Sequence, residues 1–214
     1  MVAGDGFGAR NRKGAEVRKT QDLLVCITGA SGTIYAERLL RRAIKKVERV
    51  GLVLTPQGAE IAASELGWAV DFDSMEVTGA PEEIVQQVRL YHPEDLSSPY
   101  ASGSASPDAM IVIPCTAGAA ARMASGLGDT LVTRSAAVCL KERKPLVLVV
   151  REAPLTLIDL RNLATLAEAG AVVMPAAPSF YSRPGTIEDM ADYFALRVLD
   201  QVGLRLEHPA RWRV

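Results

Sequence analysis

The sequence predicts a single α/β domain built on a doubly wound parallel sheet. Apolar strand-like runs alternate with runs of helical spacing, which is the pattern of parallel βαβ units. The run Leu146–Val150 is apolar at every position, as expected for a strand that is buried on both faces. The chain has 214 residues, of which 49% are hydrophobic, and this is enough for one sizeable core.

Apolar runs predict five strands, at residues 23–28, 50–54, 110–113, 146–150 and 171–174. Helical spacing and capping signals predict helices at residues 33–46, 56–66, 117–125, 156–168 and 186–202, with another that carries Arg134 and Lys141. Thr55 is the expected N-cap before Pro56, and either Asp129 or Thr130 caps the helix of Arg134. Residues 67–106 are weakly patterned, with a short helix expected at residues 81–88.

Both ends of the chain are expected to lie outside the folded domain. Residues 1–21 are Gly-rich, basic and polar and predict a flexible tail, residues 22–205 form the domain, and residues 206–214 form a second tail. No apolar signal core and no apolar run long enough to span a membrane is present, which favours a cytoplasmic protein. The net charge of -1 does not suggest a nucleic-acid partner.

Cysteine and histidine usage argues against metal sites and disulfides. Cys26, Cys115 and Cys139 are widely spaced and form no C-x-x-C pair, so we expect buried, unreactive thiols. There are only two histidines, and neither a His/Cys cluster nor a D-D-x-x-D motif is present. We therefore predict no bound metal.

Two strand-to-helix junctions are candidate ligand sites. Thr28-Gly29-Ala30-Ser31-Gly32 lies between the first strand and the first helix, where glycines and a helix N-terminus let a ligand approach the backbone. Pro114-Cys115-Thr116-Ala117-Gly118-Ala119 occupies the corresponding junction of a later unit and has small side chains. A tight turn explains the first segment equally well, and close helix packing is the better explanation of the second taken alone.

Charged residues around the strand at Leu146–Val150 predict a phosphate site. Arg134 and Lys141 are two helical turns apart and share a face, and Arg151 and Glu152 follow the strand directly. We expect these three cations and one carboxylate to converge on the strand end, where open parallel sheets bind ligands. A surface ion-pair network is the alternative.

Three further side chains are ambiguous by themselves. Tyr181 lies in a Pro-rich loop after a strand and is suited to donate to a phosphate or to wall an apolar pocket. Arg197 and Glu65 are expected on helices, where charged side chains are usually exposed to solvent.

Taken together and in this order, these segments resemble the flavin prenyltransferase family, the UbiX-like enzymes. The resemblance covers roughly residues 23–204. It rests on the segments ITGASGTIYAERLL, Pro114-Cys115-Thr116, GLGDTLVTRSAAVCLKERKPLVLVVREAPLTLI, AGAVVMPAAPSFYSRP and RVLDQVGL. It implies a Rossmann-like sheet of the homo-oligomeric flavin-containing cysteine decarboxylase-like fold, and a homododecamer with FMN at subunit interfaces.

The resemblance also implies an activity. Such enzymes transfer a dimethylallyl group from dimethylallyl monophosphate to N5 and C6 of reduced FMN, without a metal, and the prenylated FMN serves a UbiD-type decarboxylase. Whether the donor is the monophosphate or the diphosphate, and which decarboxylase is served, stay open.

The resemblance assigns roles to individual residues. Those implied in FMN binding are Gly29, Ala30, Ser31, Thr55, Thr116, Ala117, Gly118, Ala119 and Arg151. Those implied in binding the prenyl phosphate are Arg134, Lys141, Tyr181 and Arg197, and those implied in catalysis are Ser31, Glu65 and Glu152.

The chain departs from its relatives in places, and two other functions compete. Gly118, Ala119 and Ala120 stand where many relatives have a lysine and a Thr-Leu pair. A non-catalytic FMN-binding or FMN-delivery protein is one alternative. A flavin-dependent cysteine decarboxylase of the same fold is the other, but its histidine after the first helix and its Pro-x-Met-Asn-x-x-Met-Trp element are missing.

Overall fold

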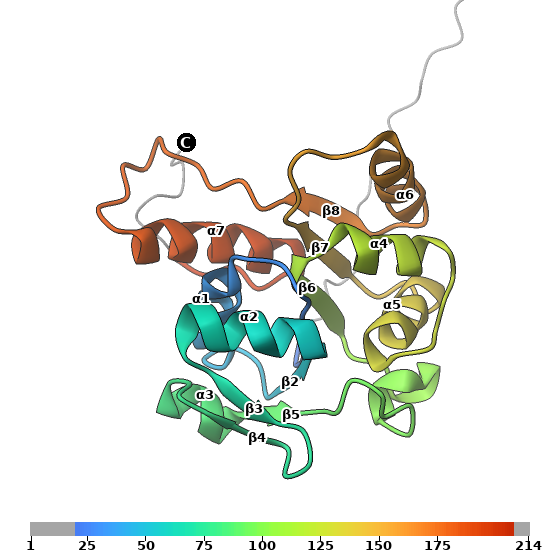
Figure 1. The fold of residues 1–214 in the computed structure, drawn as a ribbon, viewed down its shortest axis with the longest axis horizontal. Helices are drawn as coiled ribbons and strands as arrows, with labels where there is room; N and C mark the ends of the chain where they lie inside the picture. Colours follow the sequence, from blue (N-terminus) through green and yellow to red (C-terminus); the bar gives the residue numbers. More distant parts are fainter. Residues whose placement is uncertain (1–19, 208–214) are drawn as a thin grey trace, which may run out of the picture.

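A six-stranded parallel sheet forms the centre of the protein, in a computed structural model that describes residues 20–207 (Figure 1). The strand order is β5-β2-β1-β6-β7-β8, and every neighbouring pair is parallel. The strands are β1 (Asp22–Ile27), β2 (Arg49–Leu54), β5 (Val88–Leu90), β6 (Ala109–Cys115), β7 (Leu146–Val150) and β8 (Val172–Pro175). The chain thus winds outward from β1 in one direction and from β6 in the other, which confirms the doubly wound, Rossmann-like sheet.

Helices cover both faces of the sheet (Figure 1). One face of β1 packs with α1 and α7 into a common apolar cluster, and the other face packs with α4, α5 and α6 into a second cluster. The helices are α1 (Thr33–Ala43), α2 (Pro56–Leu66), α3 (Glu82–Gln87), α4 (Ala117–Ala124), α5 (Leu131–Lys141), α6 (Leu157–Glu168) and α7 (Ile187–Gln201). Burial of the sheet on both sides explains why β7 is apolar throughout.

The predicted strands and helices are present, and the differences are local. The weakly patterned region also holds the hairpin β3 (Ala69–Asp71) and β4 (Glu76–Thr78), the edge strand β5, and 3₁₀ turns at Pro99–Ala101 and Gly103–Ala105. These strands have three residues each and are at most half-buried, so their sequence carries little periodic signal. The first helix ends at Ala43, three residues earlier than predicted.

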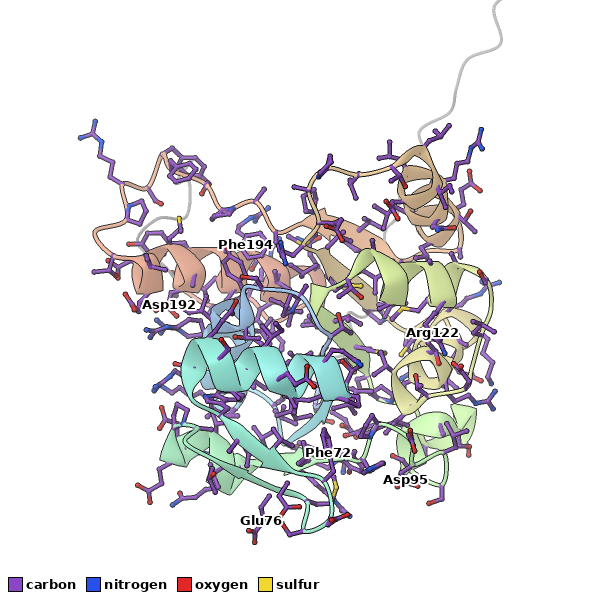
Figure 2. The ribbon with its side chains drawn as sticks, viewed as in Figure 1. Phe72, Glu76, Asp95, Arg122, Asp192 and Phe194 are labelled. Carbon is purple, nitrogen blue, oxygen red and sulfur yellow. The ribbon has the colours of Figure 1, made fainter. Side chains whose placement is uncertain are left out.

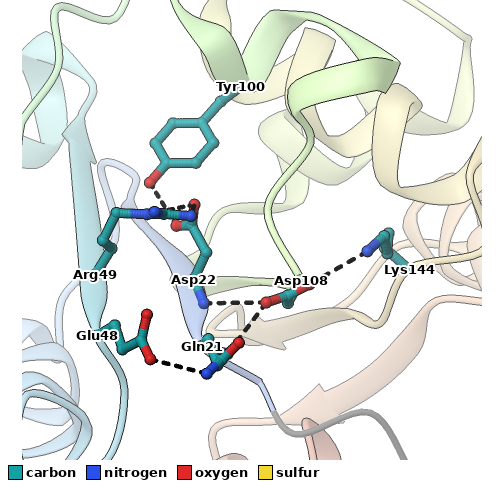
Figure 3. Close-up of polar contacts among 7 residues, drawn as sticks. All are labelled: Gln21, Asp22, Glu48, Arg49, Tyr100, Asp108 and Lys144. Carbon is teal, nitrogen blue, oxygen red and sulfur yellow. Dashed lines mark hydrogen bonds and ion pairs between the residues drawn. The ribbon is translucent and has the colours of Figure 1, made fainter.

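A polar network ties the amino-terminal edge of the sheet together (Figure 3). The Tyr100 hydroxyl donates to Asp22 Oδ1 at 2.8 Å, and Arg49 pairs with Asp22 Oδ2 at 3.0 Å. Burial of the phenol, followed by its bond to Asp22, raises the pKa of Tyr100. Gly51 makes room for the Tyr100 ring, because an added Cβ would lie 2.6 Å from a ring carbon. This network is structural and lies at the edge opposite the strand ends that face the candidate site.

The three cysteines are buried and unpaired, as predicted. Burial raises the pKa of Cys115 and of Cys139 to about 12, and that of Cys26 is also raised. Among the described helices, none is long and apolar enough to cross a membrane. The predicted tails fall mostly on residues 1–19 and 208–214, which lie outside the described residues.

Candidate active site

A cavity of about 380 Å³ opens at the carboxyl ends of β1, β2 and β6. This is the point at which the sheet switches winding direction, where doubly wound proteins bind their ligands. The cavity brings together five residues that the sequence nominated from three separate segments, namely Gly29, Thr55, Thr116, Gly118 and Ala119. Ala30 is buried behind this wall, and Ala117 is the first residue of α4.

Three helices begin at this cavity. Their N-caps are Thr55 for α2, Thr116 for α4 and Thr130 for α5, and all three residues line the wall. Each threonine hydroxyl accepts from a backbone N–H three residues on, at 3.1, 3.0 and 3.3 Å respectively. Helix N-termini carry free N–H groups and the positive end of the helix dipole. The cavity therefore favours an anion such as a phosphate.

Thr28 joins the two central strands directly beneath the cavity. Its hydroxyl donates to the carbonyl of Pro114 at 2.9 Å and accepts from the backbone N–H of Thr116 at 2.9 Å. The bond holds the end of β1 against the start of α4, and so fixes the distance between the two candidate ligand loops. The sequence places Thr28 in the first candidate ligand segment but does not predict this bond, because the contact depends on β1 and β6 being neighbours.

Glu65 and Ser31 meet on the other side of the first loop. The Glu65 carboxylate, from the end of α2, accepts from the backbone N–H groups of Gly32 and Thr33 at 2.9 and 2.8 Å. It also accepts from the Thr33 hydroxyl at 2.7 Å. Gly32 is the N-cap of α1 and has no side chain to cap with, so Glu65 does this from another helix.

The pKa of Glu65 is lowered by this arrangement. Partial burial pushes the pKa up, but hydrogen bonds from the Ser31 and Thr33 side chains and from two backbone N–H groups outweigh it. Glu65 is therefore an ionised acceptor that holds the loop Gly29–Gly32 in place.

Arg151 and Glu152 lie at the same edge of the sheet, after β7. The backbone N–H of Arg151 donates to the carbonyl of Cys115 at 3.0 Å, and both side chains are exposed. Glu152 Oε1 accepts from the N–H of Ala153 at 3.1 Å. A cation and a carboxylate thus stand beside the start of α4, as the sequence predicted.

Lys141 does not converge on this strand end within one chain, and Arg134, although it is in the first turn of α5, turns its side chain to another partner. Arg134 Nε donates to the carbonyl of Ala101 at 2.9 Å, and Lys141 pairs with Glu142 at the last turn of α5. This turn precedes β7, so Lys141 lies at the opposite end of that strand from Arg151. The two-turn spacing predicted a shared face correctly but carried no information about the end of the sheet.

Tyr181 and Arg197 are also apart from the cavity. Tyr181 is 67% exposed in the loop before α7, and Arg197 pairs with Asp200 at 3.0 Å, near the end of that helix. Neither residue lines the cavity. One chain therefore supplies a flavin-sized pocket but not the phosphate-binding set proposed from the sequence.

The residues of the cavity fit FMN, a flat ring carrying a phosphate. Three helix N-termini are suited to the phosphate, and small residues at Gly29, Gly118 and Ala119 leave room for the ring. Within residues 20–207, no group of three or more His, Cys, Asp or Glu side chains is placed to hold a metal ion. The fold and the pocket thus define a nucleotide-type cofactor-binding α/β protein, and the family model described as Flavoprotein matches residues 11–194.

Comparison with known proteins identifies a family within this class of cofactor-binding proteins. Flavin prenyltransferase UbiX of Methanothermobacter thermautotrophicus is 38% identical over 190 residues, which cover 89% of this chain and 94% of the relative. A UbiX structure in complex with FMN and dimethylallyl pyrophosphate has a TM-score of 0.78 and 33% identity, covering 91% of this chain and 100% of the other. A dodecameric FMN-dependent UbiX-like decarboxylase from Escherichia coli O157:H7 also has a TM-score of 0.78, with 35% identity over 90% of this chain and 98% of the other. The chain belongs to the flavin prenyltransferase (UbiX) family.

Proposed function

We propose that this protein is a flavin prenyltransferase that moves a dimethylallyl group from dimethylallyl monophosphate to reduced FMN. The observation that carries the proposal is the cavity at the switch point, where three helix N-termini face a space lined by small residues. Bound reduced FMN supplies the nucleophilic N5 and C6 atoms that gain the five-carbon group, and inorganic phosphate leaves. The UbiX relatives support the same reaction.

The flavin is held by the two loops and by Arg151. The segment Gly29, Ala30 and Ser31 would hold one side of the flavin, with Ser31 on the side of N5, and the segment Thr116, Ala117, Gly118 and Ala119 would hold the other; of these residues, Gly29, Thr116, Gly118 and Ala119 line the cavity. Thr55 adds the N-terminus of α2. The bond from Thr28 to Thr116 supports this assignment, because it keeps the two walls at a fixed separation.

The leaving phosphate is bound by Arg134, Lys141, Tyr181 and Arg197, and Glu152 moves a proton at a phosphate oxygen. Cations and a phenol stabilise the charge that builds up on phosphate as the allylic C–O bond breaks. Glu65 assists removal of the proton from flavin C6. Support for Glu65 is its position against Ser31, and support for Glu152 is its place beside Arg151 at the sheet edge.

Because one chain does not bring the phosphate ligands to its own cavity, we assign the complete site to an assembly of several copies. Apolar side chains are exposed on α6 and in the loop before α7, including Leu157, Ile158 and Phe180, at 61%, 70% and 73% exposure. Such a surface is typical of an interface. A homododecamer fits this need, and a dodecameric relative is known.

The protein that uses the prenylated FMN is assigned from the chemistry of the family. We assign the prenylated FMN to a partner decarboxylase of the UbiD type, and the protein to the cytoplasm.

The test is the release of phosphate under anaerobic conditions with a metal chelator present. The protein should release inorganic phosphate from dimethylallyl monophosphate only when reduced FMN is added, and not with oxidised FMN. Release of pyrophosphate from dimethylallyl diphosphate at a comparable rate would contradict the assignment of the monophosphate as the donor. Tight FMN binding with no release from either donor would favour the FMN-delivery alternative, and carbon dioxide release from a cysteine-terminated peptide would favour the decarboxylase.

A further inference from the structure

Arg122 is a charged side chain on the wall of the flavin cavity that the family resemblance does not assign. It lies on α4, four residues after Gly118 and three after Ala119, and all three line the cavity from the same helix face. Long side chains on a helix lean toward its N-terminus and cover the preceding turn. From this position a side chain that leans toward the helix N-terminus would cover the small residues of the first turn of α4.

That first turn leaves space for a guanidinium. A Cβ added to Gly118 would meet nothing nearer than the Thr116 hydroxyl, at 4.0 Å. Arg122 can move toward the N-terminus of α4 without displacing a side chain of that turn. Figure 2 shows Arg122 on the side of α4 that faces α5.

The present partner of Arg122 is Asp129, the residue before the N-cap of α5. Both side chains of this ion pair are 48% exposed, and ion pairs of that kind are weak. Arginine binds phosphate through two parallel hydrogen bonds, which are stronger than one exposed ion pair. A phosphate in the cavity is therefore a better partner for Arg122 than Asp129.

The charge balance of the cavity wall gives Arg122 a role beside the helix N-termini. Glu94 is the other charged side chain among the residues that line the cavity, and Asp129, the partner of Arg122, is not one of them. Without Arg122, a phosphate entering the cavity would meet the Glu94 carboxylate and no side-chain cation among the residues that line it.

We propose that Arg122 exchanges Asp129 for the phosphate of FMN, and so makes the pocket select FMN over riboflavin, which is the same flavin without the phosphate. The inference rests on the proposed function, since it takes the cavity to be the flavin site. It adds a specificity-determining residue and a competing carboxylate to that site.

The test measures the dissociation constants of FMN and riboflavin by quenching of flavin fluorescence, for the full-length protein and two variants. Arg122→Met removes the charge and keeps the length, and should weaken FMN binding about tenfold or more. It should leave riboflavin binding unchanged, which also shows that the pocket is intact. Asp129→Asn should bind FMN at least as tightly as the unmodified protein, because it frees Arg122.

A purely structural brace between α4 and α5 predicts different results. If Arg122 and Asp129 only held the helices together, both variants would weaken FMN binding alike, and riboflavin binding would fall with it. Either outcome overturns the proposal, as does an unchanged preference for FMN in Arg122→Met. An unmodified protein that binds neither flavin contradicts the proposed function itself, and is distinguishable from a failure of Arg122 alone.

Discussion

Replacing Glu65 by glutamine should destabilise the protein by removing the charged cap of α1. In the structure the carboxylate accepts from two backbone N–H groups and one hydroxyl, at 2.7 to 2.9 Å. Losing an N-cap costs about 0.5–2 kcal/mol, and hydrogen bonds to a charged group are worth about 1.5–3 kcal/mol each. Because Glu65 is exposed and such terms do not add, we expect a loss of about 1–2 kcal/mol.

The effect of this substitution should depend on pH in a defined direction. The pKa of Glu65 is lower in the folded protein than in the unfolded chain, where it is about 4.3. A lowered carboxyl pKa adds stability that is complete above the unfolded pKa and is lost as the pH falls through the folded value. The difference between the unmodified protein and Glu65→Gln should be constant from about pH 8 to about pH 5, and narrow below about pH 4.

Thermal unfolding followed by circular dichroism measures this difference. About 1–2 kcal/mol corresponds to a fall in Tm of about 2–8 °C for a protein of this size. Glu60→Gln, on an exposed position of the same helix, is the matched control and should leave Tm unchanged. Equal stability of Glu65→Gln and the unmodified protein at pH 7, or a difference that persists unchanged at pH 3, would refute the capping role.

Three other predictions test separate parts of the molecule. Tyr100→Phe removes the bond to Asp22 and should cost about 1 kcal/mol in urea unfolding, while FMN affinity is unchanged because the network lies at the other edge of the sheet; a weaker affinity would contradict this. Cys115 and Cys139 should react with iodoacetamide at pH 8 only after denaturation, since burial raises their pKa to about 12, and rapid labelling of the native protein would show the packing to be wrong. Arg197→Gln should keep FMN affinity, because Arg197 lies away from the cavity, but should lose phosphate release, because Arg197 is assigned to the leaving phosphate. Loss of both would place Arg197 at the flavin.

The central sheet was predictable because its strands carry a strong signal. The strands β1, β6 and β7 are apolar and buried at nearly every position, so the sequence of each segment is enough to predict a strand. The edge strand β5 has three residues, and its exposed Arg89 interrupts any apolar run. Its place in the sheet follows from pairing with β2, which no local pattern records.

The candidate site was predictable only as far as strand ends determine it. The loops after β1 and β6 were nominated because glycines and small residues precede a helix N-terminus there, and they do meet at the cavity. The bond between Thr28 and Thr116 could not be predicted because it joins segments that become neighbours only through the strand order, and Arg122 was missed because nothing local marks a helix arginine as a cavity residue. Lys141 was misplaced within the chain because helical spacing defines a face and not an end, and the side chain of Arg134 donates to the carbonyl of Ala101 instead.

The mass of the flavin after one anaerobic incubation tests the central claim most directly. The protein is mixed with FMN, dithionite and dimethylallyl monophosphate without metal, and the flavin is released and weighed by mass spectrometry. The account predicts that the flavin gains the mass of one five-carbon prenyl unit. Recovery of unmodified FMN from protein that binds it tightly, with the monophosphate and the diphosphate alike, would contradict the account.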